Sequence, residues 1–276
     1  TYIVLFIIFG AFLERTGIAN FFIAFANRLA GWSAGGPAKV AVISSALCGM
    51  VSGSSVGNTV TTGSVTIPMM KKTGYKPEFA GAVEAAASTG GQIMPPIMGA
   101  AAFLMAEYMN IPYAKVAVKA ILPAVLYFTG IFIAVHLEAK KLGLKGLSKD
   151  EMPKWADLGK KIYLLSPLVL LVWLVSSGAK TMQFSAAVSI LAAVIVGFLN
   201  KDERLTFKKI FEALEAGAKG AITVAVACAI AGMIAGCITV TGLASILINA
   251  IVQLAGSATF IGLILTMVCC IVLGMG

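Results

Sequence analysis

The most distinctive polar stretch of this sequence is the run Ser-Gly-Ser-Ser-Val-Gly-Asn-Thr at residues 52–59, which lies between two apolar segments. It offers the hydroxyls of Ser52, Ser54 and Ser55 and the side-chain amide of Asn58, with no carboxylate among them. Neutral oxygen ligands suit a weakly held monovalent cation such as Na⁺, by the same hard-ligand preference that pairs Ca²⁺ with oxygen. The alternative interpretation is that the glycines and serines only allow helices to pack closely in lipid.

A helix that begins at Asn58 would direct its positive dipole end and its unpaired N–H groups toward the same place. Thr59, Thr61 and Thr62 add neutral hydrogen-bond donors along the first turns of that helix. These three threonines are therefore predicted to face an anionic substrate, next to the predicted Na⁺ site.

A second polar interruption, Thr-Gly-Gly-Gln-Ile-Met-Pro-Pro, occupies residues 89–96. Because proline lacks an N–H donor, carbonyl groups near Gly91 and Gln92 are expected to lose their helical partners, and the two glycines allow the chain to unwind. An unwound stretch would present oxygens to a cation held at residues 52–59, whereas the alternative is a plain proline kink. The predicted Na⁺ ligands are Ser52, Ser54, Ser55, Asn58, Thr89, Gly90 and Gly91, and the predicted helix break is at Pro95 and Pro96.

Glu84 is the one acid well inside an apolar segment. Acids inside a membrane are costly and often functional. Glu84 could carry protons or hold a structural partner, and the sequence favours neither. The chain has no Ser/His/Asp set, phosphate loop or metal cluster, and its five cysteines lie in or beside apolar runs without metal-ligand spacing. We therefore predict no enzymatic activity and no cofactor.

The composition identifies the elements that must position these residues as membrane helices. Of the 276 residues, 59% are hydrophobic and only 12% are charged, and the mean hydropathy is +0.95. A soluble chain carries roughly 25% charged residues. Apolar runs near the ~20 residues that a transmembrane helix needs alternate with short lysine-rich joints. The basic residues that give the net charge of +9 cluster at the edges of these apolar runs, and this distribution argues against nucleic-acid binding.

The chain is expected to fold as an all-α polytopic membrane protein. Its expected helices are 2–13, 18–30, 38–50, 58–70, 78–109 with a break at 89–96, 113–137, 162–177, 182–199, an amphipathic interfacial helix 205–218, and then 221–240, 243–255 and 258–274. The segments 38–50 and 58–70 have 13 residues each, or ~20 Å of helix, which is too short to cross a bilayer. Together they predict a re-entrant hairpin, 38–70, whose tip must be buried in protein or line a wet cavity.

An internal repeat supports a transporter architecture. Residues 16–31 align without gaps to residues 241–256, with seven of 16 positions identical, and the same offset of 225 places Gly49-Met50 on Gly274-Met275. Five crossings separate the two copies, so the second copy is expected to run the opposite way, as in inverted-topology repeats. The predicted division is 1–137 for the first repeat, 138–161 for a cytoplasmic loop, and 162–276 for a second repeat that stops at its hairpin.

The distribution of basic residues gives the same topology. With residues 138–161 in the cytoplasm, 18 of the 21 Lys and Arg residues lie inside, and only Lys115, Lys119 and Lys180 lie outside. The first hairpin would then open from the cytoplasm and the second from the other face.

The runs at residues 52–58, 67–75 and 80–96 resemble the large membrane subunit of TRAP transporters (tripartite ATP-independent periplasmic transporters). The exact residues of these motifs are most similar to those of the fused-permease branch that is associated with TAXI binding proteins. The resemblance covers nearly the whole chain. It implies Na⁺-driven uptake of an organic acid anion, delivered by a periplasmic binding protein to an elevator-type transport domain.

The resemblance also implies a multi-pass protein of a bacterial or archaeal cytoplasmic (inner) membrane, in contact with lipid. This chain would be a fragment that needs the remaining N- and C-terminal parts of the permease. The alternatives are a secondary anion carrier with the same hairpins but no binding protein, or a non-transporting assembly subunit. The identity of the acid, the ion stoichiometry and the oligomeric state do not follow from the sequence.

Overall fold

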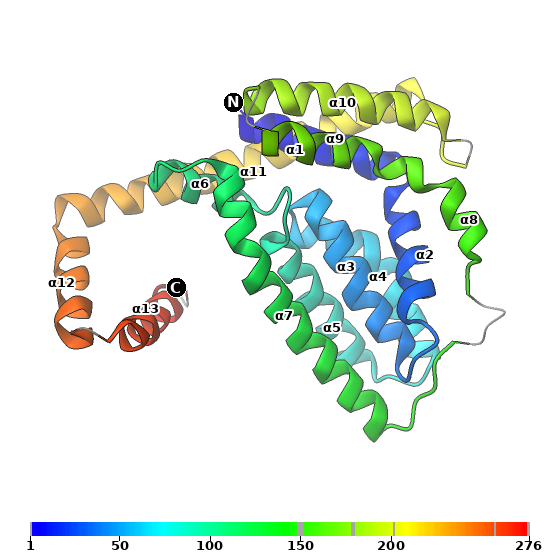
Figure 1. Ribbon diagram of the computed structural model, residues 1–276, viewed down its shortest axis with the longest axis horizontal. Coiled ribbons are helices and arrows are strands. Elements are labelled where there is room, and N and C mark those ends of the chain that lie inside the picture. The colour runs from blue at the N-terminus through cyan, green and yellow to red at the C-terminus, as the bar shows by residue number, and fades with distance from the viewer. Residues whose placement is uncertain (1, 148–151, 178–179, 201, 257, 275–276) are drawn as a thin grey trace. The chain divides into compact units, whose positions relative to one another are not determined.

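The structure is a computed structural model that describes residues 2–147, 152–177, 180–200, 202–256 and 258–274, and the regular structure in these residues is helical (Figure 1). Within these residues, three helices are long and apolar enough to cross a membrane: α7 (Tyr113–Lys141), α10 (Met182–Leu199) and α11 (Phe207–Val240). The helices α1 (Tyr2–Arg15) and α2 (Ile18–Ala30), bent by 67° to each other, would together make a fourth span. The chain is an all-α polytopic membrane protein, as predicted.

The chain forms two compact units, residues 1–221 and 222–276. In the first unit α1 packs on α10, which also contacts α9 (Ser166–Ser177). The helices α3 (Gly36–Ser52), α4 (Ser55–Lys72) and α5 (Pro77–Gly90) pack side by side, with α7 against α3 and α5 (Figure 1). The remaining elements are η1 (Gly91–Ile93), α6 (Ala100–Tyr108), α8 (Trp155–Lys160), η3 (Ile162–Leu165), and in the second unit α12 (Leu243–Ala255) packed on α13 (Thr259–Gly274).

Small apolar side chains fill the core between the hairpin, α5 and α7. Ala38 of α3, Ala80 of α5 and Ala139 of α7 have no exposed surface, and Val135 is only 1% exposed. Small residues let helix backbones approach closely, which is how helices pack where the surrounding lipid is as apolar as the side chains.

The predicted hairpin is present, but its limbs are longer and its tip is shorter than predicted. The limbs α3 and α4 have 17 and 18 residues, and only Gly53 and Ser54 lie between them. Gly53 closes α3 in the left-handed conformation, with φ at 61°, and Ser54 begins α4 as its N-cap. At 1.5 Å per residue each limb is ~26 Å long, so limb length alone does not exclude a crossing. The evidence for a hairpin is the turn and the contact between α3 and α4.

The broken helix is confirmed, but its break begins later than predicted. Thr89 and Gly90 belong to the last turn of α5, and the irregular segment runs from η1 to Gly99 before α6 begins. Within this last turn the hydroxyl of Thr89 donates a hydrogen bond to the carbonyl of Ala85, four residues earlier, at 2.8 Å.

Two helix boundaries differ from the prediction. The span predicted at 113–137 continues to Lys141 as α7, and residues 138–161 also contain α8; Lys149 lies outside the described residues. The interfacial helix 205–218 and the span 221–240 are one continuous helix, α11. Gly217 and Gly220 lie inside this helix, where an added Cβ would be 2.9 Å from Ile8 and 3.0 Å from Ile7 of α1.

The repeated sequence gives the same local turn twice. Gly17 and Gly242 both adopt the left-handed conformation, with φ of 81° and 69°, and each precedes a helix of 13 residues. The copies differ at the other end, where φ is −59° at Gly31 and 54° at Gly256. The inverted orientation of the repeats and the division 1–137, 138–161 and 162–276 stay predictions, and Met275, which would continue the second hairpin, lies outside the described residues.

We expect Gly17→Ala to lower stability, because a side chain in the left-handed conformation costs about 1–2 kcal/mol and a Cβ on Gly17 would lie 2.9 Å from a carboxylate oxygen of Glu203. The measurement is the thermal unfolding midpoint in detergent. Gly130→Ala is the matched control, because a Cβ at that position in α7 meets no atom within 4 Å. Equal midpoints for the two variants would contradict the prediction.

Candidate ion and substrate site

The serines of the hairpin tip close the turn. The Ser54 hydroxyl accepts a hydrogen bond from the backbone N–H of Gly57 at 3.2 Å, which caps α4. The Ser52 hydroxyl lies 3.4 Å from the carbonyl oxygen of Ser54, and the Ser55 hydroxyl accepts from Nε2 of Gln92 at 2.9 Å. Each predicted serine ligand therefore has a partner within the protein in this conformation.

The hairpin tip and the helix break lie against each other, as the sequence predicted. The N–H of Ile97 donates to the carbonyl of Met50 at 3.3 Å, and a Cβ on Gly53 would lie 2.3 Å from the carbonyl oxygen of Met98. The contact between Ser55 and Gln92 adds a side-chain bridge. The two polar interruptions of the sequence, about 40 residues apart, thus form one structural region.

Two backbones also approach closely at Gly49 of α3 and Gly91 of η1. A Cβ on Gly49 would lie 2.3 Å from the Cα of Gly91 and 3.1 Å from Nδ2 of Asn58. Asn58, only 1% exposed, donates from Nδ2 to the carbonyl of Ser45 at 2.8 Å, and its Oδ1 is buried without a hydrogen-bond partner among the described residues. Asn58 and Gly91 are therefore the predicted Na⁺ ligands that the fold brings together.

Thr89 and Gly90 point elsewhere. Thr89 is exposed, and a Cβ on Gly90 would lie 2.4 Å from a ring carbon of Tyr127 in α7. The carbonyls of Gly91 and Gln92 do lose their α-helical partners at Pro95 and Pro96, but they are not left free for a cation, because they accept from the N–H groups of Met94 at 3.2 Å and Gly99 at 2.7 Å. The irregular backbone after the break supplies the bonds that the two prolines cannot.

Tyr113 binds the backbone beyond those prolines. Its hydroxyl contacts the carbonyl of Pro96 at 2.8 Å and also that of Ile97, and its ring stacks on Phe103 of α6 with centroids 4.4 Å apart. The break at Pro95 and Pro96 is therefore held by the first residue of α7.

The three threonines predicted to face substrate are in different environments. Thr59 and Thr61 are half-buried, and their hydroxyls donate to the carbonyls of Ser55 and Gly57, each at 2.9 Å. Thr62 is fully buried and its hydroxyl contacts the carboxylate of Glu84, so it is closed to substrate in this conformation.

Glu84 lies at the centre of a hydroxyl cluster that joins three helices. It has no exposed surface. Its carboxylate accepts from the hydroxyls of Ser45 at 2.7 Å and Ser88 at 3.1 Å and contacts those of Thr62 and Thr66. A buried carboxylate needs such donors, because its removal from water is otherwise very costly. The cluster binds both limbs of the hairpin to α5.

Sequence reasoning singled out Glu84 but not its partners Ser45, Thr66 and Ser88. One signal was available for two of these hydroxyls. Thr66 follows Thr62 and Ser88 follows Glu84 by four residues, the spacing that places side chains on one face of a helix. The third, Ser45, comes from α3 and becomes visible only once the hairpin has folded.

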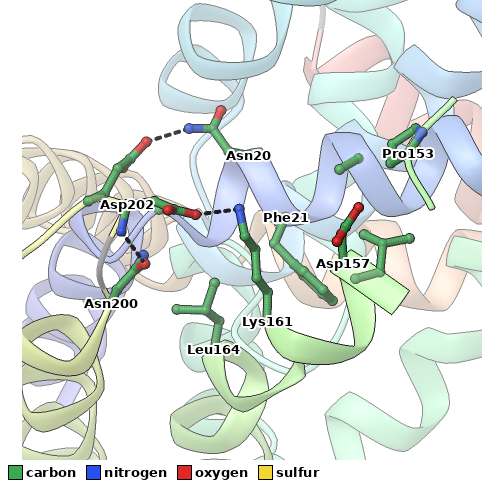
Figure 2. Close-up of a pocket in the computed structure, with 12 residues that line it drawn as sticks. Asn20, Phe21, Pro153, Asp157, Lys161, Leu164, Asn200 and Asp202 are labelled. Carbon is green, nitrogen blue, oxygen red and sulfur yellow. Dashed lines mark hydrogen bonds and ion pairs between the residues drawn. The ribbon is translucent and has the colours of Figure 1, made fainter. Parts of the chain in front are cut away.

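A polar pocket of about 180 Å³ lies at the bend between α1 and α2 (Figure 2). On its wall Lys161 pairs with Asp202 at 2.5 Å, and this hydrogen bond raises the pKa of Lys161. Asn20 donates to Glu203 at 2.5 Å, and Nδ2 of Asn200 donates to the carbonyl of Thr16 at 2.8 Å. No sequence motif indicated this pocket, and its polar residues bind one another and the bend.

The fold and the site define the class of protein. A helical hairpin packed against a broken membrane helix, with polar groups buried where they meet, is an architecture of secondary transporters. A comparison with protein families then identifies the family: the chain matches "Tripartite ATP-independent periplasmic transporter, DctM component" over residues 1–276, and it belongs to that family.

Relatives of this chain include large permease proteins of three bacteria. It is 28% identical over 203 residues to the C4-dicarboxylate TRAP transporter large permease protein DctM of Pseudomonas aeruginosa, covering 73% of this chain and 47% of the relative. It is 29% identical over 193 residues to the protein of that name in Vibrio cholerae, covering 70% and 42%. A putative TRAP transporter large permease protein of Haemophilus influenzae is 27% identical over 271 residues, covering 98% and 63%. The matched part is about half the length of the first two relatives.

We expect Gly49→Ala to destabilise the protein, because a Cβ on Gly49 meets backbone of Gly91 at 2.3 Å and the backbone must move to relieve the clash. Overpacking of this kind costs about 1–3 kcal/mol. The thermal midpoint in detergent measures the effect. Gly81→Ala is the control, since that position in α5 has no atom within 4 Å of the added Cβ. A Gly49→Ala midpoint equal to that of the control would show that the two backbones do not touch.

We expect Glu84→Ala to lower the free energy of unfolding by about 2–3 kcal/mol, because hydrogen bonds to a buried charged group are lost. Glu84→Gln should lose less, because its amide oxygen still accepts from Ser45. Chemical unfolding in detergent would compare the two variants. If both match the unmodified protein, the hydroxyl cluster does not stabilise the hairpin.

Proposed function

We propose that this chain is part of the membrane subunit of a Na⁺-coupled, binding-protein-dependent secondary transporter that imports an organic acid anion. The observation that carries the proposal is the junction of Gly49, Gly91 and Asn58, where hairpin tip and helix break meet around a buried amide oxygen that has no hydrogen-bond partner among the described residues. Membership of the DctM family and relatives named for C4-dicarboxylate support the transporter class and an organic acid as cargo.

In this proposal the ion and the anion have separate ligands on the same hairpin. The amide oxygen of Asn58 and backbone near Gly91 contribute to the Na⁺ site, and the tip serines join it once their present partners are exchanged. The N-terminal turns of α4, with Thr59 and Thr61, face the anion, because the positive end of the helix dipole and hydroxyl groups favour negative charge. Bound Na⁺ would add positive charge beside the anion and so couple the two binding events.

The transport cycle that we propose is of the elevator type, with hairpin and broken helix moving as one body. The hydroxyl cluster at Glu84 supports this, because it links α3, α4 and α5 through side chains that are all buried. The proposed setting is the inner membrane of a bacterium or archaeon, with a periplasmic binding protein that delivers substrate to the complete permease.

The experiment is uptake of labelled organic acids, with C4-dicarboxylates first, by liposomes that hold the full-length permease. Uptake is expected only when a Na⁺ gradient and the binding protein are both present. Uptake without a binding protein would favour a different secondary carrier, and a folded protein without uptake under any condition would favour an assembly subunit.

We expect Asn58→Ala to abolish Na⁺-dependent uptake while expression stays unchanged, because the variant removes both the amide oxygen and the donor to Ser45. Ser64→Ala is the matched control on the same helix, since Ser64 is exposed. The initial rate of uptake at saturating Na⁺ is the measurement. Full uptake by Asn58→Ala would remove the hairpin tip from the mechanism.

A further inference from the structure

An open hollow lies where the end of α2 meets the start of α8. Its volume is about 610 Å³, and it is lined by Arg28, Leu29, Trp32, Met152 and Trp155. Trp32 is 67% exposed and Trp155 is 52% exposed, so two of the three tryptophans of the chain meet at one open surface. None of the lining residues belongs to the polar pocket at the bend between α1 and α2. The hollow is therefore a separate feature, and the proposed transport cycle uses none of its residues.

Arg28 brings a positive charge to the hollow. Among the described residues no ion pair includes Arg28, and its Nε is buried without a hydrogen-bond partner among them. The aspartate of α8, Asp157, lines the polar pocket at the bend instead. A guanidinium group presents five N–H donors in a planar fork, which fits two oxygens of a phosphate or a carboxylate. Arg28 is therefore suited to bind an anion at this surface.

Aromatic contacts hold the walls of the hollow in place. The guanidinium carbon of Arg28 lies 5.5 Å from the centre of the Trp155 ring, and that ring makes an edge contact with Phe25, with centroids 6.4 Å apart. Trp155 thus joins α8 to two positions on α2 that are three residues apart, and the two helices lie beside each other (Figure 1). Nε1 of Trp32 donates to the carbonyl of Leu29 at 3.2 Å, which orients the second indole. The groups that would contact a ligand are therefore positioned by the protein itself.

The hollow lies at the level where a membrane protein meets lipid headgroups. Arg28 is in the last turn of α2, the second half of the bent pair that would make one span. The N–H of Leu147 donates to the carbonyl of Gly31 at 2.8 Å, so the chain that follows the span α7 comes to the same end of α2. The last turn of α7 carries Lys140 and Lys141. Basic residues and tryptophans at the ends of spans are typical of the interface between hydrocarbon and water.

From these contacts we propose that the hollow binds an anionic phospholipid of the surrounding bilayer. The fork of Arg28 holds the lipid phosphate, and the exposed surfaces of Trp32 and Leu29 lie against the glycerol and the first methylene groups of the acyl chains. The charge of the site favours an anionic headgroup over a zwitterionic one. A choline or ethanolamine group needs an acidic partner, and no described residue on the wall is acidic. Lys154, exposed beside Trp155 in the sequence, adds a second positive charge instead.

The bound lipid would act on the element that leads into the hairpin. The helix α2 connects the bend after α1 to the first limb of the hairpin, α3, and Trp155 packs α8 on α2. A ligand that binds Arg28 beside Trp155 stabilises this arrangement of α2 and α8, because a ligand stabilises the conformation that binds it. The inference goes beyond the proposed function, since it holds for any cargo and any coupling ion.

The experiment measures the thermal midpoint of the full-length permease in detergent while phosphatidylglycerol or phosphatidylcholine is added. We expect phosphatidylglycerol to raise the midpoint at a lower concentration than phosphatidylcholine does. Arg28→Gln should increase the phosphatidylglycerol concentration at half-maximal shift about fivefold, since one basic residue near an anionic bilayer contributes roughly this factor. Arg204→Gln is the matched control, because Arg204 is exposed and lies outside the hollow, and it should leave that concentration unchanged.

A second variant, Trp32→Ala, tests the aromatic wall. The indole of Trp32 is mostly exposed, so its removal opens no core. The midpoint without lipid should therefore equal that of the unmodified protein, while a higher phosphatidylglycerol concentration is needed for the same shift. Glycerol 3-phosphate, added without lipid, should cause no shift.

The outcomes separate a specific site from general attraction between charges. Equal effects of Arg28→Gln and Arg204→Gln would show that anionic lipid acts only through the overall charge, and the site would be wrong. The proposal also fails if Arg28→Gln keeps the response of the unmodified permease, or if the unmodified permease does not distinguish the two lipids. A shift with glycerol 3-phosphate as large as that with phosphatidylglycerol would replace the lipid by a free phosphate. None of these results bears on Na⁺-dependent uptake, which is measured separately.

Discussion

The approach of two backbones at Gly49 and Gly91 is the constraint on which the rest of the site depends. A side chain at either position would clash with the backbone opposite, at 2.3 Å from Gly91 Cα in one direction and 2.6 Å from Gly49 Cα in the other. Only this proximity places Asn58 beside the helix break, brings Gln92 to Ser55 and allows Ile97 to bond to Met50. Asn58 is buried at this contact, whereas the half-buried or exposed serines of the tip bind groups of the hairpin and Gln92.

The hairpin is held from a second direction by the hydroxyl cluster at Glu84. Burial of a carboxylate in this position would cost too much free energy without hydrogen-bond donors. Four hydroxyls from α3, α4 and α5 contact it. Such a cluster stabilises only one arrangement of the three helices, because displacement of any one of them leaves a buried charge with fewer donors. The apolar core nearby consists largely of alanine and valine, which fit many arrangements, so the polar cluster makes the packing specific.

The sequence predicted elements well where strong local signals mark their ends, and poorly where tertiary contacts decide. The bounds of α2, α10 and α12 follow from apolar runs that begin after Thr-Gly or Thr and end at Gly or Asn. The serines of the tip were predicted as loop, yet as a cap they extend both limbs, and Gly217 was predicted to lie near a helix end although it gives α1 room to pack. Of the candidate site, Asn58 and Gly91 lie together, while Thr89 and Gly90 face elsewhere. Each residue of a helix is rotated by about 100° from the one before it, and the sequence does not show which face meets the hairpin.

The uninterrupted course of α11 has a mechanical consequence. Thirty-four residues make a rod of ~51 Å, well beyond the ~30 Å hydrocarbon thickness, so roughly two fifths of its length extends past the lipid tails if it stands upright. The polar first turns of α11 contact the end of α1 through the ion pair of Arg15 and Glu212. A change in the inclination of these first turns of α11 would therefore act directly on the carboxyl end of α1, because the ion pair joins the two.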